Sequence, residues 1–166
     1  MDPANQKDLR AEDRRRLGDL FWSAIGAATA ITLALWLVGE RGTPFLLASL
    51  GGSTVFLFAL TDAEAAQPRA LFGGHFIGAL TGILCFQVFG DGLWVSTLAV
   101  AITLVFMVIT RTIHPPAGAN PLFMVHYHAG FSALFVPVGL GVTALFAIAL
   151  LWSRIRPGKP YPIRWW

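Results

Sequence analysis

Six apolar segments follow one another along this chain, separated by short polar connections. Crossing a bilayer as a continuous helix takes about 20 apolar residues, with a lower limit of roughly 17. Four of the segments meet this length easily, and they lie at residues 20–38, 70–89, 93–110 and 131–152. We therefore predict an all-α, polytopic membrane protein with four full spans. The last span contains Pro137, where a kink is expected.

The second apolar segment, residues 43–60, is interrupted near its middle. Gly51 and Gly52 are followed directly by two hydroxyl residues, Ser53 and Thr54. Glycine commonly ends a helix, and serine or threonine commonly caps the start of the next one. The pattern therefore predicts two half-helices that meet at the Gly-Gly pair.

The fifth apolar segment, residues 114–125, is interrupted at its start. Pro115 and Pro116 lack the backbone N–H, so they most naturally end one element and open the next. Three small residues follow at 117–119, where backbone or ligand can approach closely. An interrupted element at membrane depth survives only if it is buried in protein or lines a polar cavity. We expect the rest of the chain to be organised around this break.

The two interrupted segments occupy matching positions, because each is the second of three apolar segments in its half of the chain. Paired interrupted segments of this kind are the sequence signature of a transporter built from repeats. Since each half holds an odd number of segments, the halves would be inverted relative to each other. The pattern therefore predicts a 3+3 inverted repeat, in which the broken segments either cross the membrane or re-enter on one side.

The charged residues give a separate indication of topology. If all six segments cross and the N-terminus is cytoplasmic, Arg69, Arg111 and the basic tail at 154–164 all lie in the cytoplasm. Only Arg41 then lies outside, as the positive-inside rule favours. Both alternatives, crossing or re-entrant, place the two termini in the cytoplasm. We expect a multi-pass protein of a bacterial-type inner (plasma) membrane.

The composition agrees with a membrane protein of one domain. The 166 residues are 55% hydrophobic and 13% charged, with a mean hydropathy of +0.64, which is outside the ordinary soluble range. We divide the chain into a polar cytoplasmic segment at 1–19, a transmembrane domain at 20–153 and a basic aromatic cytoplasmic tail at 154–166. The net charge of +3 comes from basic clusters that flank the apolar spans. These clusters favour contact with the lipid bilayer, and no nucleic-acid partner is expected.

No combination of residues typical of an enzyme is present, so we expect no catalytic residues. His126 and His128 are two residues apart and do not share a helix face, and Cys85 stands alone in an apolar run. We therefore expect neither a metal nor a cofactor. No Asp, Glu, Lys or Arg lies well inside a span, where cation pumps and proton-coupled carriers usually keep a carboxylate.

An anion fits these segments better than a cation. Helix N-termini offer free N–H groups and about half a positive charge. Two half-helices that start near 52–54 and near 117–119 would point those ends at one small monovalent anion at the midplane. The predicted substrate-binding residues are Gly52, Ser53, Thr54, His75, His114, Ala117, Gly118 and Asn120.

Some of these positions also have a purely structural explanation. His114 either contacts the anion or takes part in proton linkage, or it only orients the Pro-Pro turn. His75 either belongs to the site or makes a hydrogen bond between helices. Gly74, Gly78 and Gly82 recur every four residues on one helix face, which favours close helix packing over a pathway.

Three segments carry a family resemblance: HPPAGANPL at 114–122, SLGGSTVFLFA at 49–59 and QPRALFGGHFIGALTGI at 67–83. In this order they resemble the HPP family of small integral membrane proteins. The resemblance implies a compact multi-helix membrane protein and, from plastid and cyanobacterial members, transport of nitrite. The alternative is a non-transporting sensor or assembly subunit whose broken segments pack against a partner. A chain this small has little interior in which to seal a pathway, which favours a homo-oligomer.

Overall fold

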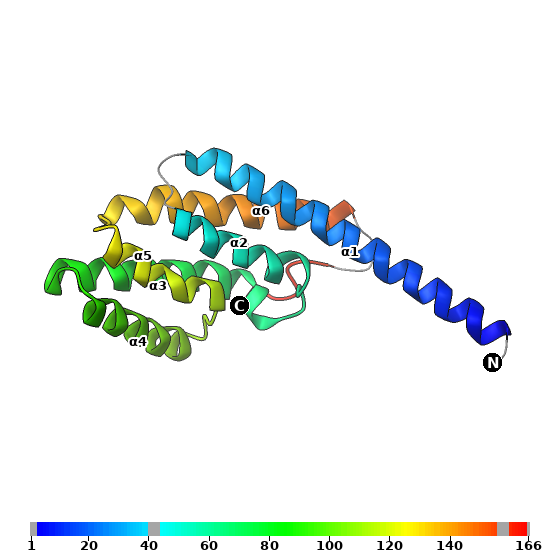
Figure 1. Cartoon of the computed structure of the whole chain (residues 1–166), viewed down its shortest axis with the longest axis horizontal. Helices are drawn as coiled ribbons and strands as arrows, with labels where there is room; N and C mark the ends of the chain where they lie inside the picture. Colours follow the sequence, from blue (N-terminus) through cyan, green and yellow to red (C-terminus); the bar gives the residue numbers. More distant parts are fainter. Residues whose placement is uncertain (1–2, 40–43, 156–159, 166) are drawn as a thin grey trace.

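Four long apolar helical stretches form the frame of the protein, and two shorter helices lie between them (Figure 1). The computed structural model describes residues 3–39, 44–155 and 160–165. Within these residues every regular element is helical. The long stretches are α1 (Pro3–Val38), α3 (Pro68–Phe89), α4 (Leu93–Thr110) and the final stretch, Phe131–Ile155. The prediction of an all-α membrane protein with four long spans is confirmed.

The final stretch is irregular in its first half, as the proline predicted. It begins with a 3₁₀ turn, η4 (Phe131–Leu134), continues as a π-helical turn, η5 (Phe135–Leu140), and becomes regular only in α6 (Gly141–Ile155). Pro137 lies within the π turn. Its missing N–H breaks the regular hydrogen-bond ladder, and a wider turn accommodates the change of register.

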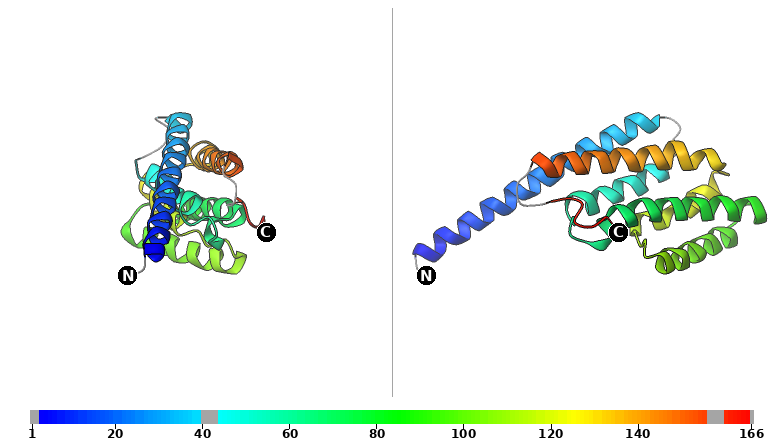
Figure 2. Two further views of the ribbon diagram at one scale, coloured as in Figure 1. Left: turned by 90° about the vertical axis from the view of Figure 1, so that its right-hand side faces the viewer. Right: turned by 180° about the vertical axis from the view of Figure 1, so that it is seen from behind.

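The first helix is longer than its apolar part. From Pro3 onward, the polar segment predicted at 1–19 and the span predicted at 20–38 belong to one helix, because α1 runs without a break to Val38. Arg16 pairs with Glu12 one turn away at 2.6 Å, a spacing that supports a solvated helix. The polar end of α1 projects beyond the other helices (Figure 2). The connection predicted at 39–42 lies outside the described residues except for Gly39.

Successive helices run in opposite directions through the bundle (Figure 1). The two short helices take part in this alternation: α2 (Pro44–Phe58), and η3 (Pro115–Ala119) continuing into α5 (Asn120–His126). The N-terminal end of α1, the start of α3, the end of α4 and the end of α6 therefore lie at one end of the bundle. This alternation is the one expected if all six segments cross. Because four helices of the described residues are long and apolar enough to span a bilayer, the crossing or re-entry of the two short ones stays a prediction.

The helix contacts repeat between the two halves of the chain. The contact of α1 with α2 corresponds to that of α4 with α5, and the contact of α3 with α4 corresponds to that of α6 with α1. The contact of α3 with α5 likewise corresponds to that of α6 with α2. A twofold axis that exchanges the two halves of the chain would produce these corresponding contacts. The contacts therefore support the inverted repeat, which stays a prediction.

One glycine row allows α3 to lie directly against the broken segment. A Cβ atom built on Gly74 would lie 2.9 Å from the carbonyl oxygen of Thr112. Built on Gly78 or Gly82, it would lie 2.6 Å from the Ala117 carbonyl oxygen or from Pro121 Cα, respectively. Contacts this short require glycine. The prediction that the row serves helix packing is confirmed.

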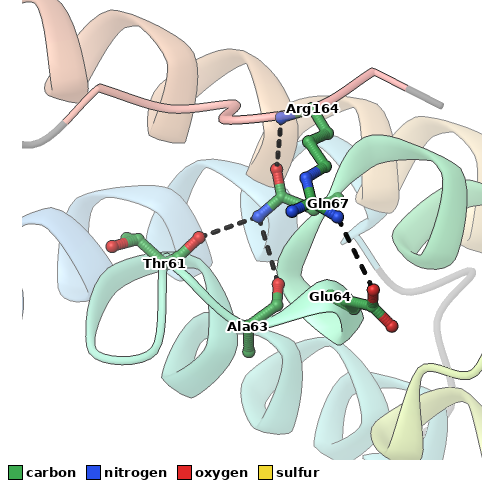
Figure 3. A network of polar contacts seen from close by, with 5 residues as sticks. All are labelled: Thr61, Ala63, Glu64, Gln67 and Arg164. Carbon is green, nitrogen blue, oxygen red and sulfur yellow. Dashed lines mark hydrogen bonds and ion pairs between the residues drawn. The ribbon is translucent and has the colours of Figure 1, made fainter.

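The last described residues, 160–165, fold back onto the same end of the bundle instead of lying free along the interface. Tyr161 is buried and donates a hydrogen bond from its hydroxyl to the Ala66 carbonyl at 2.7 Å. The Gln67 side-chain oxygen accepts from the backbone N–H group of Ile163 at 3.0 Å and from that of Arg164 at 3.1 Å; Figure 3 shows the second of these bonds. These bonds fix the tail beside the start of α3.

Candidate functional site: a buried serine–histidine–asparagine network

The broken segment begins where α4 ends. Arg111 adopts the left-handed conformation, with φ 55° and ψ 45°, and so terminates that helix. His114 is extended, and Pro115 and Pro116 occupy the first positions of η3. The predicted break at the Pro-Pro pair is confirmed, although the element that follows is a 3₁₀ turn before α5 begins.

The predicted break at Gly51 and Gly52 is wrong, because α2 is continuous from Pro44 to Phe58. The hydroxyl groups that were expected to cap a new helix instead lie within hydrogen-bond distance of carbonyl groups of the same helix. Ser53 Oγ lies 3.0 Å from the Ser49 carbonyl, and Thr54 Oγ1 donates to the Gly51 carbonyl at 2.7 Å. Hydroxyl groups satisfied in this way do not terminate a helix.

The second glycine of the pair, Gly52, instead allows α2 to lie close to the broken segment. A Cβ atom on Gly52 would lie 3.2 Å from Pro116 Cβ, and Ser49 Oγ donates to the Pro116 carbonyl at 2.8 Å. That carbonyl belongs to the 3₁₀ element, whose irregular backbone must find partners outside itself. The unbroken helix therefore supplies a hydrogen bond that the broken segment needs.

Ser53 is the centre of a buried polar network. Its Oγ lies 2.9 Å from His75 Nε2 on α3 and 2.8 Å from His114 Nε2 before η3. The two imidazole rings lie 5.1 Å apart between centroids. On the far side of His75, Asn120 Nδ2 lies 3.0 Å from Nδ1. On the far side of His114, Nδ1 lies 2.6 Å from the Ala65 carbonyl oxygen.

Two backbone carbonyls determine the direction of these hydrogen bonds, because a carbonyl only accepts. The Ala65 carbonyl requires the proton of His114 on Nδ1, so Nε2 of the neutral ring accepts. Asn120 Nδ2 also donates to the His75 carbonyl at 3.1 Å, so the amide nitrogen faces His75 and its Nδ1 accepts. His75 then donates from Nε2 to Ser53, and Ser53 donates to His114.

The network is enclosed by protein on all sides. Ser53, His75, His114 and Asn120 each have 0% exposure. Three buried side-chain atoms of the described residues lack a hydrogen-bond partner: Trp22 Nε1 on α1, Thr103 Oγ1 on α4 and Asn120 Oδ1 at the start of α5. An unpaired buried carbonyl oxygen accepts readily from a water or from a protonated group.

The eight predicted residues divide into three sets. Ser53, His75, His114 and Asn120 form the network itself, and Gly52 and Ala117 allow the close approach of the backbones around it. Thr54 bonds to its own helix, and Gly118 has open space beside it. The prediction did not include Ser49 and the Ala65 carbonyl. The spacing of Ser49, four residues before Ser53, was a usable signal, whereas a backbone carbonyl leaves none.

The other histidines lie away from this network. His128 follows α5, stacks on Phe86 at 4.7 Å between centroids, and lies 3.1 Å from the Asp91 carboxylate. That hydrogen bond lowers the pKa of Asp91. His126 is exposed at the end of α5. Neither histidine is placed to reach the buried network.

Comparisons with known proteins agree with the membrane architecture. Residues 12–162 match the family described as "HPP, transmembrane region". Two curated proteins of Dictyostelium discoideum, both named as transmembrane proteins, are similar to this chain. One is 33% identical over 165 residues, covering 92% of this chain and 53% of the relative. The other is 30% identical over 163 residues, covering 90% and 57%. The chain thus spans about half the length of these relatives, and no match was found among solved structures.

Proposed function

Because this chain belongs to the HPP transmembrane-region family, we propose that it carries a small monovalent anion, nitrite foremost, across the membrane. The observation that supports this proposal is the polar network at the meeting point of α2, α3 and η3. Its polar groups are hydroxyl, imidazole and amide. Among the described residues, the buried polar side chains include no carboxylate, lysine or arginine. A cation would therefore find no opposite charge there.

A proton on His114 would give the network the positive charge that an anion needs. Ser53 has a second acceptor available, the Ser49 carbonyl at 3.0 Å. When His114 Nε2 takes up a proton, it becomes a donor to Ser53, and the Ser53 hydroxyl turns to that carbonyl. The network thus accommodates one proton without moving a heavy atom. We propose that a proton and the anion move together, because the pair is nearly neutral in a medium that penalises isolated charge.

The anion reaches the network only when α2 separates from η3. The contacts that hold these elements together are the Ser49 hydrogen bond to Pro116 and the packing of Gly52 on the same proline. Both are local, so their loss does not require the long helices to come apart. The arrangement described here is accordingly a closed state of the proposed transporter.

Nitrite flux into proteoliposomes tests the proposal. Uptake should fall at least about tenfold in Ser53→Ala and His114→Ala, since each removes a donor that the anion or its proton requires. The matched control is His126→Ala, an exposed histidine, which should leave uptake unchanged. A pH-sensitive dye trapped in the lumen should report proton entry that depends on nitrite. Flux that is equal in all three variants would refute the site.

The complete burial of the network favours one alternative. In that case the hydrogen bonds only stabilise the broken segment, and the chain is a sensor or an assembly subunit. The flux assay separates the two functions. A wild-type protein that is folded in proteoliposomes yet passes no small anion would support the non-transporting function.

We also propose that both termini face the cytoplasm. The ends of α1 and α6, with Arg69 and Arg111, lie at one end of the bundle, as the positive-inside rule requires of a cytoplasmic face. Reporter fusions at each terminus test this orientation. Activity of an exported reporter such as alkaline phosphatase at either end would contradict it.

A further inference from the structure

Two adjoining cavities open at the end of the bundle where α3 begins and α4 ends. The first, about 230 Å³, is lined by Arg69, Arg111 and Arg164 together with Gln67 and Trp165. The second, about 350 Å³, is lined by Ala65, Val108 and Ile113. Both cavities share Glu64, Ala70 and Arg111 in their walls. The two cavities therefore adjoin, and we refer to them together as the hollow, with a polar half and an apolar half.

The polar half carries a positive charge. Its three guanidinium groups come from three separate parts of the chain, whereas Glu64 is the one carboxylate in its lining. The Glu64 side chain is 93% exposed and lies 3.8 Å from Arg164, too far for a strong hydrogen bond. Arg69 uses one N–H group on the Thr110 carbonyl, which leaves other donors available. Guanidinium groups arranged in this way recognise a phosphate.

Hydrogen bonds hold the lining of the polar half in place. The Gln67 side-chain oxygen accepts from two backbone N–H groups of the tail. Its side-chain nitrogen donates to the Thr61 and Ala63 carbonyls (Figure 3). Together with Tyr161, Gln67 holds Arg164 beside the arginines of α3 and α4. Arg111 is held by its left-handed backbone at the end of α4. The three charges are thus kept together against their mutual repulsion.

The apolar half points to a ligand with a hydrocarbon chain. Val108 and Ile113 are 53% and 47% exposed, and Trp165 at the edge of the polar half is 55% exposed. Exposed tryptophan beside arginine is typical of the level of the lipid head groups. A free inorganic anion would fill the arginine half and gain nothing from the apolar one.

We propose that this hollow binds an anionic phospholipid, with the phosphate among Arg69, Arg111 and Arg164 and an acyl chain along Val108 and Ile113. The positive charge of the polar half, the apolar wall beside it and the position at the end of the bundle all match a single amphiphilic ligand. Ala65, whose carbonyl accepts from His114, also lines the apolar half. An acyl chain in the apolar half would therefore lie beside a residue that is hydrogen-bonded to the buried network.

Native mass spectrometry of the full chain with added lipid tests the proposal. The probes are phosphatidylglycerol, which is anionic, and phosphatidylcholine, which is zwitterionic. We expect retained phosphatidylglycerol on the wild type and binding that is roughly fivefold weaker in Arg111→Gln and in Arg164→Gln. The matched control is Arg154→Gln, an exposed arginine that does not line the hollow. Its lipid binding should equal that of the wild type.

Three outcomes would overturn the proposal. The first is equal retention of the two lipids by the wild type. The second is a loss of lipid binding in Arg154→Gln as large as that in Arg111→Gln and Arg164→Gln. The third is thermal stabilisation by inorganic phosphate as large as that by phosphatidylglycerol. The last result would assign the arginines to a free anion. Because the readout is lipid binding, it is independent of nitrite flux, and either proposal can fail without the other.

Discussion

The glycine row on α3 offers the sharpest test of how the broken segment is held. We consider Gly78→Ala. The added Cβ would lie 2.6 Å from the Ala117 carbonyl oxygen, about 0.8 Å less than the 3.4 Å at which ordinary contact begins. The obstacle is backbone, so no flexible side chain can turn away from it. Either α3 or η3 must shift, and overpacking of this kind typically costs about 1–3 kcal/mol.

A matched control removes the effect of helix propensity. Gly51 also lies inside a helix, but a Cβ atom built there meets nothing within 4 Å. In both positions the change to alanine favours the helix by about 1 kcal/mol. Because this gain is common to both, the difference between Gly78→Ala and Gly51→Ala isolates the clash. We expect Gly51→Ala to be as stable as the wild type or more so, and Gly78→Ala to be about 1–3 kcal/mol less stable than Gly51→Ala.

The assay is reversible unfolding of each variant in lipid bicelles, by steric trapping or by titration with a denaturing detergent, followed through tryptophan fluorescence. Gly82→Ala, whose Cβ would lie 2.6 Å from Pro121 Cα, should behave like Gly78→Ala. If Gly51→Ala and Gly78→Ala prove equally stable, the backbones of α3 and η3 do not lie this close, and the account of the packing is incorrect.

Three further predictions concern the polar contacts. Ser53→Ala leaves Nε2 of two buried imidazoles unpaired, at a cost of about 1–3 kcal/mol for each unpaired group, so we expect a loss of about 2–6 kcal/mol in the same unfolding assay. A loss of less than half the lower figure would contradict the network. Tyr161→Phe removes the hydrogen bond to the Ala66 carbonyl, so limited trypsin digestion should cleave after Arg164 sooner than in the wild type. Unchanged cleavage would show that this hydrogen bond does not hold the tail in place. The His128 hydrogen bond lowers the pKa of Asp91 below 3.8. The contact therefore stabilises the fold above that pH, and this stabilisation is lost as the pH falls through the lowered pKa. The stability difference between wild type and Asp91→Asn should therefore shrink as the pH is lowered from about 5 toward 3, and a difference that grows would refute the sign.

The sequence predicted one of the two breaks correctly, and the reason lies in the residues concerned. Pro115 and Pro116 lack the N–H group by covalent structure, so a helix through them is costly in any surroundings. Gly51 and Gly52 only permit a break, because glycine is tolerated inside a helix when a neighbour needs the space. At Gly52 that neighbour is Pro116, which is distant in sequence, and no local pattern identifies it.

The site was predicted by residue type but not by its connections. Ser53, His75, His114 and Asn120 were recognised as rare polar groups in apolar surroundings, which is the strongest sequence signal in a membrane protein. Which of the adjacent residues Ser53 and Thr54 faces the site depends on the rotation of α2, which the predicted break at the Gly-Gly pair left undetermined. The acceptor for His114 is a backbone carbonyl, that of Ala65, which carries no signature in the sequence.

One unbroken helix beside one broken segment implies how the site would open. Ser49 and Ser53 are one turn apart on the same face of α2, so a single rigid face serves both the freed carbonyl of Pro116 and the two histidines. A tilt or rotation of α2 would break all three contacts together. The broken segment is tied to α3 by backbone contact along the glycine row, so it cannot move away on its own. In the proposed transporter the helix that would move is therefore α2, and access to His114 would be coupled to the loss of the Ser49 bond.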